Sequence, residues 1–150
     1  MAAADAYVNG SSTTTKATNY GGATSLRADA DPEMRSYLRF SVQGLAGPPR
    51  RATLRVYATS SHGTGYRVHG VADTGWGEGT LTCNNAPAYG GVVGTSGGFG
   101  AGAWTSVDVT PLVTGNGPVS LALTTGSATQ LSLASRETAN APHLVIEPGP

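Results

Sequence analysis

Short runs of alternating apolar and polar residues recur along the chain, and clusters of Gly, Pro, Asn, Asp or Ser separate them. An alternation of period two is the pattern of a β-strand with one buried face. Frequent turns between such strands are typical of sandwiches and barrels, and no stretch of eleven or more residues has the apolar stripe of a helix. The pattern predicts an all-β fold with about ten strands, near residues 5–8, 25–28, 36–42, 52–59, 66–71, 81–83, 104–109, 119–124, 131–135 and 143–147.

The alternation also predicts which side chains leave the core, because neighbouring residues of a strand point to opposite faces of the sheet. Leu38 and Phe40 are expected to face inward, which places Tyr37 and Arg39 on the outer face. Trp76 is expected to close one end of the fold. Trp104 is expected to pack in the core. The same alternation turns further side chains outward, namely Arg55, Tyr57, Ser132, Ala134 and Arg136.

Turn residues and loops agree with this fold. Asn9-Gly10 and Asn116-Gly117 supply the positive φ angles of tight turns. The glycine-rich stretch 89–102 is expected to form a long surface loop, which in a compact domain is either functional or mobile. A length of 150 residues is usual for one domain, and we find no repeat or internal linker. We therefore expect a single domain over residues 1–150.

The charges exclude some partners. The chain has nine Lys and Arg and nine Asp and Glu without a run of like charge, so it lacks the basic stripe of a nucleic-acid-binding protein. It has no apolar run long enough to cross a membrane. Eight of its nine basic residues lie before residue 68, which indicates either a positive patch or a general preference for arginine. The single cysteine, Cys83, has no second cysteine with which to form a disulfide.

One acidic turn is a candidate metal site. Asp29, Asp31 and Glu33 place three carboxylates within five residues, and oxygen ligands of this kind suit calcium. The alternative is a solvated turn, because Asp and Pro favour turns for their own conformational reasons. Asp5 is a further candidate by analogy with β-sandwich modules that bind calcium near their termini. The candidate ligands of a structural calcium ion are thus Asp5, Asp29 and Asp31, and no other cofactor is expected.

No catalytic site is indicated. The segment Gly94-Thr95-Ser96-Gly97-Gly98 fits the G-x-S-x-G pattern, but a nucleophile elbow needs a helix after the serine. His62, His69 and His143 have neither metal-binding spacing nor a recognisable relation to a nucleophile and an acid. Two carboxylates from different strands could still meet as in glycoside hydrolases. We expect that the chain is not an enzyme.

Several motifs, taken in order, carry a family resemblance. They are Ala4-Asp5-Ala6-Tyr7-Val8, Asn19-Tyr20-Gly21, Ser25-Leu26-Arg27, Arg35-Ser36-Tyr37-Leu38-Arg39-Phe40, Trp76-Gly77-Glu78, Thr82-Cys83-Asn84-Asn85-Ala86-Pro87, Val107-Asp108-Val109-Thr110, Leu133-Ala134-Ser135-Arg136-Glu137 and Asn140-Ala141-Pro142. Each motif alone is common, whereas their order and spacing together are specific. Over essentially its whole length the chain resembles the DNRLRE-type domain, which is similar to carbohydrate-binding module family 96.

The resemblance implies a jelly-roll β-sandwich of two antiparallel sheets. It implies a secreted, extracellular bacterial module without catalytic activity, which binds acidic polysaccharide such as alginate for an attached catalytic domain. We also expect the module to be a monomer. Since the family binds mostly through basic residues, it suggests Arg27, Arg35, Arg39 and Arg136 as ligand residues. Tyr37 adds a flat ring for a sugar, and guanidinium groups bind carboxylates in pairs of hydrogen bonds.

Two alternatives stay open beside this function. Arg39 or Arg136 would instead form ion pairs with Glu137, Asp108 or Glu78 that join the sheet edges. The whole module would then be a structural or stabilising accessory of a secreted hydrolase or phosphoesterase, with no glycan ligand of its own.

Overall fold

Strands form most of the regular structure of residues 1–149, the part of the chain that the computed structural model describes. The only α-helix there has four residues, and no helix in these residues is long and apolar enough to span a membrane. In chain order the elements are β1 (Ala4–Asn9), α1 (Thr13–Lys16), β2 (Ser25–Ala30), β3 (Glu33–Val42), β4 (Arg51–Tyr57), β5 (Arg67–Val71), β6 (Val92–Thr95), β7 (Trp104–Asp108), the 3-10 turn η1 (Thr110–Leu112), β8 (Gly117–Thr124), β9 (Leu131–Ala134) and β10 (His143–Glu147).

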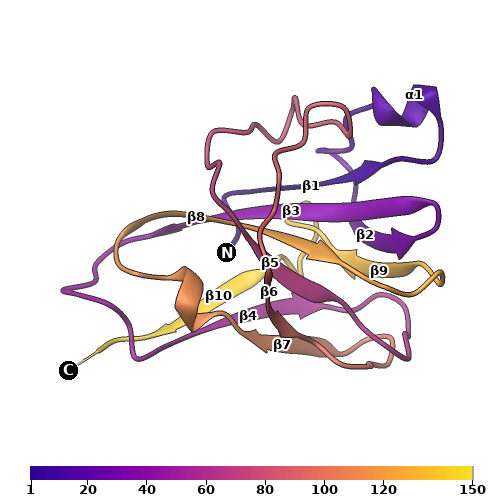
Figure 1. The fold of residues 1–150 in the computed structure, drawn as a ribbon. Helices are drawn as coiled ribbons and strands as arrows, with labels where there is room; N and C mark the ends of the chain where they lie inside the picture. The colour runs from indigo at the N-terminus through magenta and orange to yellow at the C-terminus, as the bar shows by residue number, and fades with distance from the viewer. Residues whose placement is uncertain (150) are drawn as a thin grey trace.

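The strands form two antiparallel sheets (Figure 1). The large sheet has the order β6-β5-β8-β3-β2-β9, and β1 also pairs with β3. The small sheet has the order β10-β4-β7 and lies at the bottom of the view in Figure 1. The protein is therefore the β-sandwich of two antiparallel sheets that its sequence predicts.

The main core lies between the sheets. Leu38 and Phe40 of β3 and Leu54 and Val56 of β4 are all buried there, with at most 2% of their surface exposed. Because residues of opposite parity on these strands point away from this core, the predicted inward and outward positions are confirmed for both strands. Most of the hydrophobic stabilisation comes from this layer.

A second apolar layer covers the outer face of the large sheet. Residues 72–91, which we call the covering segment, connect β5 to β6 and pack Trp76 and Leu81 against Tyr37 and Val8. Tyr37 is consequently fully buried, and the prediction that it offers an exposed ring was wrong. Alternation reports which face of a sheet a residue occupies, but it does not report whether another segment covers that face.

Five further predictions about local structure were wrong. Neither residue of Asn9-Gly10 has the positive φ angle predicted for a tight turn there. Residues 81–83 belong to the covering segment and do not form a strand, whereas Val92–Thr95, predicted to be loop, forms β6. A Cβ atom at Gly94 would lie 2.7 Å from Cγ1 of Val107, so the glycine allows β6 to lie close to β7. Trp76 packs over the outer face of the large sheet and does not close an end of the sandwich. Trp104 is half-buried and lies outside the core cluster.

Candidate functional site

Two of the predicted ligand residues hold the covering segment in place. The guanidinium of Arg39 donates from Nη1 to the carbonyl oxygen of Trp76 and, at 3.4 Å, to that of Thr74. Its carbon Cζ lies 4.9 Å from the Trp76 ring centroid, which adds a cation–π contact. The Tyr37 hydroxyl donates to the carbonyl oxygen of Pro87 at 2.7 Å. Both side chains are therefore engaged within the chain.

Arg136 forms an ion pair with Glu78 of the covering segment. Its Nη1 lies 2.9 Å from Glu78 Oε2, and the backbone N–H of Arg136 donates to Asp5 Oδ2 at 2.8 Å. The backbone N–H of Asp5 in turn donates to Glu78 Oε1 at 3.0 Å. The alternative of an ion pair with Glu78 is thus confirmed for Arg136, and the pair ties the N-terminal strand, the covering segment and the residues after β9 together.

The Asp5 carboxyl is buried within this cluster, with 1% of the residue exposed. Its Oδ1 atom has no hydrogen-bond partner among residues 1–149. Burial raises the pKa of Asp5 to about 7, and the neighbouring Glu78 carboxylate adds to the rise, against the opposing hydrogen bond from Arg136. Asp5 therefore holds its proton to a much higher pH than an ordinary aspartate.

The predicted calcium ligands do not gather in one place. Asp5 pairs with Leu38 of β3, whereas Asp29 pairs with Met34 of the same strand, four residues away. Across the described chain no three His, Cys, Asp or Glu residues are grouped so that they could hold a metal ion. The structure therefore does not bring Asp5 together with Asp29 and Asp31, and calcium binding at Asp5 stays a prediction. Calcium binding by the acidic turn itself stays a prediction.

Arg27 lies beside a pair of stacked tyrosines. Its Cζ is 5.2 Å from the ring centroid of Tyr7, which stacks on Tyr20 at 4.4 Å. This arrangement leaves the side chain partly exposed, but Arg27 does not line either of the two hollows that mark the outer face of the large sheet.

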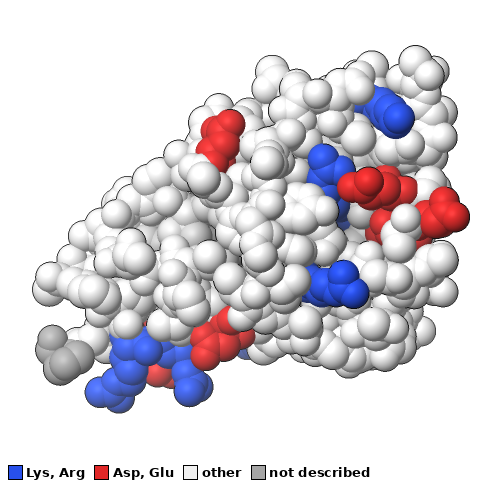
Figure 2. All heavy atoms as spheres, viewed as in Figure 1, with Lys and Arg blue, Asp and Glu red and all other residues white. Residues whose placement is uncertain are grey.

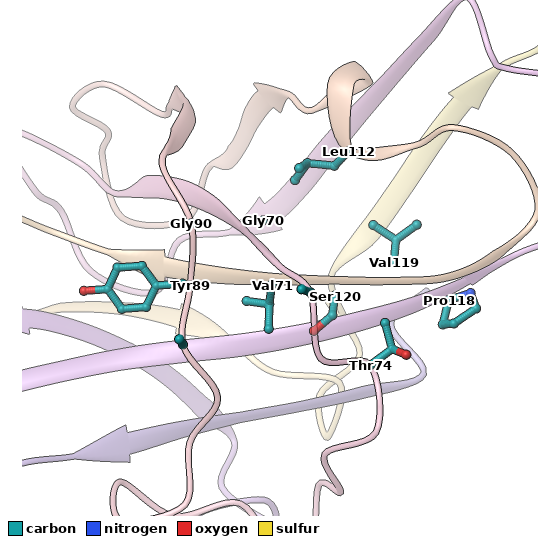
Figure 3. A pocket seen from close by; sticks show the side chains of 11 residues that line it. Gly70, Val71, Thr74, Tyr89, Gly90, Leu112, Pro118, Val119 and Ser120 are labelled. Atoms are coloured by element: carbon teal, nitrogen blue, oxygen red, sulfur yellow. The ribbon is translucent and has the colours of Figure 1, made fainter.

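Those two hollows meet at Tyr89 of the covering segment, and we call them together the Tyr89 groove. The larger has a volume of about 570 Å³ and lies over β5 and the start of β8, and the smaller has about 270 Å³. Figure 3 shows Tyr89 at one end of the larger hollow, Val71 and Ser120 along it with Leu112 to one side, and Pro118 and Val119 toward the other end. The larger hollow is mostly apolar, and 41% of the Tyr89 surface is exposed.

The smaller hollow carries the charges of the groove. Arg35 and Arg67 line it together with Asp29 and Glu33. Figure 2 shows basic side chains above and below a group of acidic ones at the right of the view, over the ends of β2, β3 and β5. The groove therefore combines an aromatic ring, two guanidinium groups and carboxylates.

The two arginines of the groove differ in how firmly they are held. Arg35 donates to Tyr37 Oη at 2.8 Å and to Glu33 Oε1 at 2.7 Å, and its Cζ is 5.8 Å from the Tyr89 ring centroid. Burial alone would lower the pKa of Arg35, but the bond to Tyr37 and the charge of Glu33 raise it. The Arg67 side chain is exposed and makes no hydrogen bond or ion pair with any described residue. Arg67 is thus the guanidinium that is free to bind a ligand.

His69 fixes the position of Tyr89. One ring nitrogen of His69 hydrogen-bonds the Gly90 carbonyl oxygen at 2.8 Å, the other lies 2.7 Å from Thr124 Oγ1, and its ring is 4.5 Å from that of Tyr89. Since both nitrogens are engaged, His69 positions the covering segment over β5 and β8. The Tyr89 ring is therefore held in place although its surface is exposed.

Of the predicted ligand residues, the structure brings only Arg35 into the groove, and it adds Arg67 and Tyr89. Arg67 alternates with the inward Val68 on a predicted strand, so its outward direction was available from the sequence. Tyr89 lay in the glycine-rich stretch predicted to be a functional or mobile loop. Neither signal revealed that the covering segment would bring the two side chains together.

Ser96, the serine of the G-x-S-x-G pattern, takes part in local backbone bonding. Its Oγ donates to the Gly97 carbonyl oxygen at 2.8 Å and accepts from the backbone N–H of Tyr66 at 2.9 Å. Strand β6 precedes the serine, but the next helical element along the described chain is η1, which begins at Thr110. The segment therefore lacks the strand–turn–helix geometry of a nucleophile elbow.

Comparison with known proteins places the chain in a family. No curated protein matches it. The model of carbohydrate-binding module family 96 matches residues 1–148, which is nearly the whole sequence. The match confirms the predicted similarity to this family, while the DNRLRE-type name stays a prediction. The chain, a two-sheet β-sandwich with a groove lined by arginine and tyrosine on one outer face, belongs to carbohydrate-binding module family 96.

Proposed function

We propose that the chain is a non-catalytic module that binds acidic polysaccharide in the Tyr89 groove, on behalf of a catalytic domain in the same secreted protein. Membership of a carbohydrate-binding family supports the ligand class. The single observation that carries the choice of site is the free, exposed guanidinium of Arg67 beside the exposed ring of Tyr89.

The chemistry of the groove favours a sugar with a carboxylate. A guanidinium donates two parallel hydrogen bonds to a carboxylate, and such charge-assisted bonds are about twice as strong as neutral ones. The ring of Tyr89 offers an apolar surface for the C–H groups of a pyranose, with a hydroxyl at its edge. Asp29 and Glu33 are acceptors for sugar hydroxyl groups. Of the ligand residues suggested by the family, Arg35 alone lines the groove, where it lies against Tyr89 and supplies a second positive charge.

The open shape of the groove suits an internal stretch of a polymer. Its two hollows follow β5 and β8 on either side of Tyr89 and are lined by residues from the covering segment, so a chain can enter and leave at both ends. Binding at an open groove of this kind is weak for each sugar, and attachment to an enzyme raises the effective concentration of substrate. We therefore assign the module the role of anchoring the enzyme to its polysaccharide.

Affinity electrophoresis tests this function. The protein is run in gels that contain alginate, pectate, chitosan or neutral glucan, at low and high salt. We expect retardation by alginate or pectate, weaker at high salt because Arg67 is exposed to screening, and none by chitosan. Retardation by neutral glucan alone would contradict the acidic ligand. Absence of retardation in every gel would favour the accessory role without a glycan.

A further inference from the structure

The outer face of the small sheet carries aromatic and basic side chains that no described element covers. Tyr57 of β4 pairs with Trp104 of β7, and Arg55 of β4 pairs with His143 of β10. Paired residues on antiparallel strands share a face, so these four side chains lie together, and we call them the aromatic face. Arg55 and His143 are exposed, and Tyr57 and Trp104 are half-buried. In Figure 1 the small sheet forms the bottom of the molecule, and no other element lies below it.

Trp104 is the centre of this cluster. The Tyr57 ring lies edge-on to it at 5.3 Å, the His143 ring is 5.8 Å away, and Cζ of Arg55 lies 5.4 Å from its centroid. The indole, phenol, imidazole and guanidinium groups make no hydrogen bonds to other residues of the described chain. The cluster thus offers ring surface and several free hydrogen-bonding groups side by side.

The size and composition of this face favour a saccharide over a protein partner. Where all three strands lie side by side, over the five residues of β7 and β10, the sheet measures roughly 17 Å by 10 Å. This area is far smaller than the about 800 Å² that each partner buries in a stable interface. The one large apolar side chain on it that is exposed is Val145, at 46%. Toward the other end the sheet carries charged residues, with Arg51 of β4 opposite Glu147 of β10 in the strand register. A pyranose, with an apolar C–H face and polar edges, matches rings that are surrounded by donors.

We propose that the aromatic face is a second carbohydrate-binding surface. A pyranose ring of a polysaccharide packs on Trp104 and Tyr57, and its hydroxyl or carboxylate groups bind Arg55 and His143. The inference extends the proposed function, because it takes its ligand class from the family, but it does not depend on the Tyr89 groove. The two surfaces lie on opposite sides of the sandwich, so one module holds two polysaccharide segments, and simultaneous binding raises its avidity.

Iodide quenching of tryptophan fluorescence tests the second surface. The chain has two tryptophans. Trp76 is 7% exposed and Trp104 is half-buried at the surface, so Trp104 carries the iodide-accessible fluorescence. The probes are short alginate oligosaccharides and neutral cello-oligosaccharides, and calorimetric titration gives the number bound.

Five variants are compared with the wild type. The groove variant is Arg67→Ala with Tyr89→Ala, the face variant is Arg55→Ala with His143→Ala, and a third variant combines both. The other two are Trp104→Ala and Arg51→Ala, the latter a control on the same face away from Trp104. A cooperative thermal unfolding transition shows that each variant folds.

We expect two oligosaccharides to bind the wild type and one to bind each double variant. In the groove variant the bound oligosaccharide protects Trp104 from iodide. Adding the face substitutions weakens this binding by roughly tenfold or more, as does Trp104→Ala, whereas Arg51→Ala has no effect. If the groove variant loses all binding and its Trp104 stays accessible to iodide, the second surface is overturned and the proposed groove site is not. If the face variant loses all binding and the groove variant does not, the result supports binding at the aromatic face and contradicts binding in the groove. A wild type that binds no saccharide would overturn both.

Discussion

The carboxyl of Asp5 is held where a charge is poorly stabilised. It is buried beside the half-buried Glu78 and Arg136, accepts one backbone hydrogen bond, and has a second oxygen without a partner in residues 1–149. Burial and the Glu78 charge raise its pKa from 3.8 to about 7. A buried carboxyl of this kind makes stability depend on pH, because the folded state keeps a proton that the unfolded chain releases.

We predict that the protein is more stable at pH 5 than at pH 8. The contribution of Asp5 is fully present below its unfolded pKa, near 4, and is lost as the pH rises through the folded value, about 7. The difference in unfolding free energy should be on the order of 2–4 kcal/mol. Urea denaturation across this range measures it.

Two substitutions separate Asp5 from the other titrating groups. Asp5→Asn should flatten the pH dependence and raise stability at pH 8, because the amide carries no charge. Asp31→Asn, at an exposed aspartate, should leave the dependence as it is in the wild type. An unchanged slope in Asp5→Asn would show that the carboxyl is not the source.

Substitution of the two groove arginines should change the unfolding free energy by different amounts. Arg35→Ala breaks charge-assisted bonds to Tyr37 and Glu33 and should lower the unfolding free energy by about 1–2 kcal/mol. Arg67→Ala breaks no bond within the described chain and should change stability by less than about 0.5 kcal/mol. Denaturation curves of both variants give the comparison. Equal losses would mean that Arg67 is also structural.

At the scale of elements, the covering segment is held to the large sheet through Trp76. The indole is buried against Tyr37, its N–H donates to Ser120 Oγ at 2.8 Å, and Arg39 lies over its ring. Asn19 adds hydrogen bonds to the carbonyl oxygens of Glu78 and Leu81 at 2.7 and 2.8 Å. The segment therefore behaves as a packed layer, and Tyr89 takes its position from it.

Substitution of the two tryptophans should distinguish this layer from the small-sheet face. Trp76→Ala removes a buried side chain and should cost about 3–5 kcal/mol of unfolding free energy. Trp104→Ala removes a half-buried surface ring and should cost about 1 kcal/mol. Comparable losses in urea denaturation would contradict the different burial of the two rings.

The strands were largely predictable from the sequence. The segment that covers the outer face of the large sheet was not. Alternation located the strand around Leu38 because one of its faces packs on the core, a local property of period two. The strand at Val92–Thr95 escaped detection because it is short, glycine-containing and defined by pairing with β5. Burial of Tyr37 depends on residues forty to fifty positions further along the chain. Arg35 was predicted for the site through the family resemblance, whereas Arg67 and Tyr89 meet only through tertiary packing.

For the whole molecule, the proposed function divides structural and binding roles between the faces of the sandwich. The interior and the covering segment supply stability, and the Tyr89 groove and the aromatic face leave arginines and rings exposed on opposite sides. A rigid scaffold of this kind loses little conformational entropy when it binds a polymer, because its contact groups are already positioned. The account therefore depends on the groove binding a sugar chain without rearrangement.

Calorimetric titration of alginate oligosaccharide into three proteins tests this claim most directly. The proteins are the wild type, Arg67→Ala with Tyr89→Ala, and Arg50→Ala, which removes an exposed arginine outside the groove. We predict that affinity for the groove falls at least about tenfold in the double variant, as loss of a charge-assisted contact implies, and is unchanged in Arg50→Ala. Equal binding by all three proteins, with the same number of oligosaccharides bound, would contradict the account.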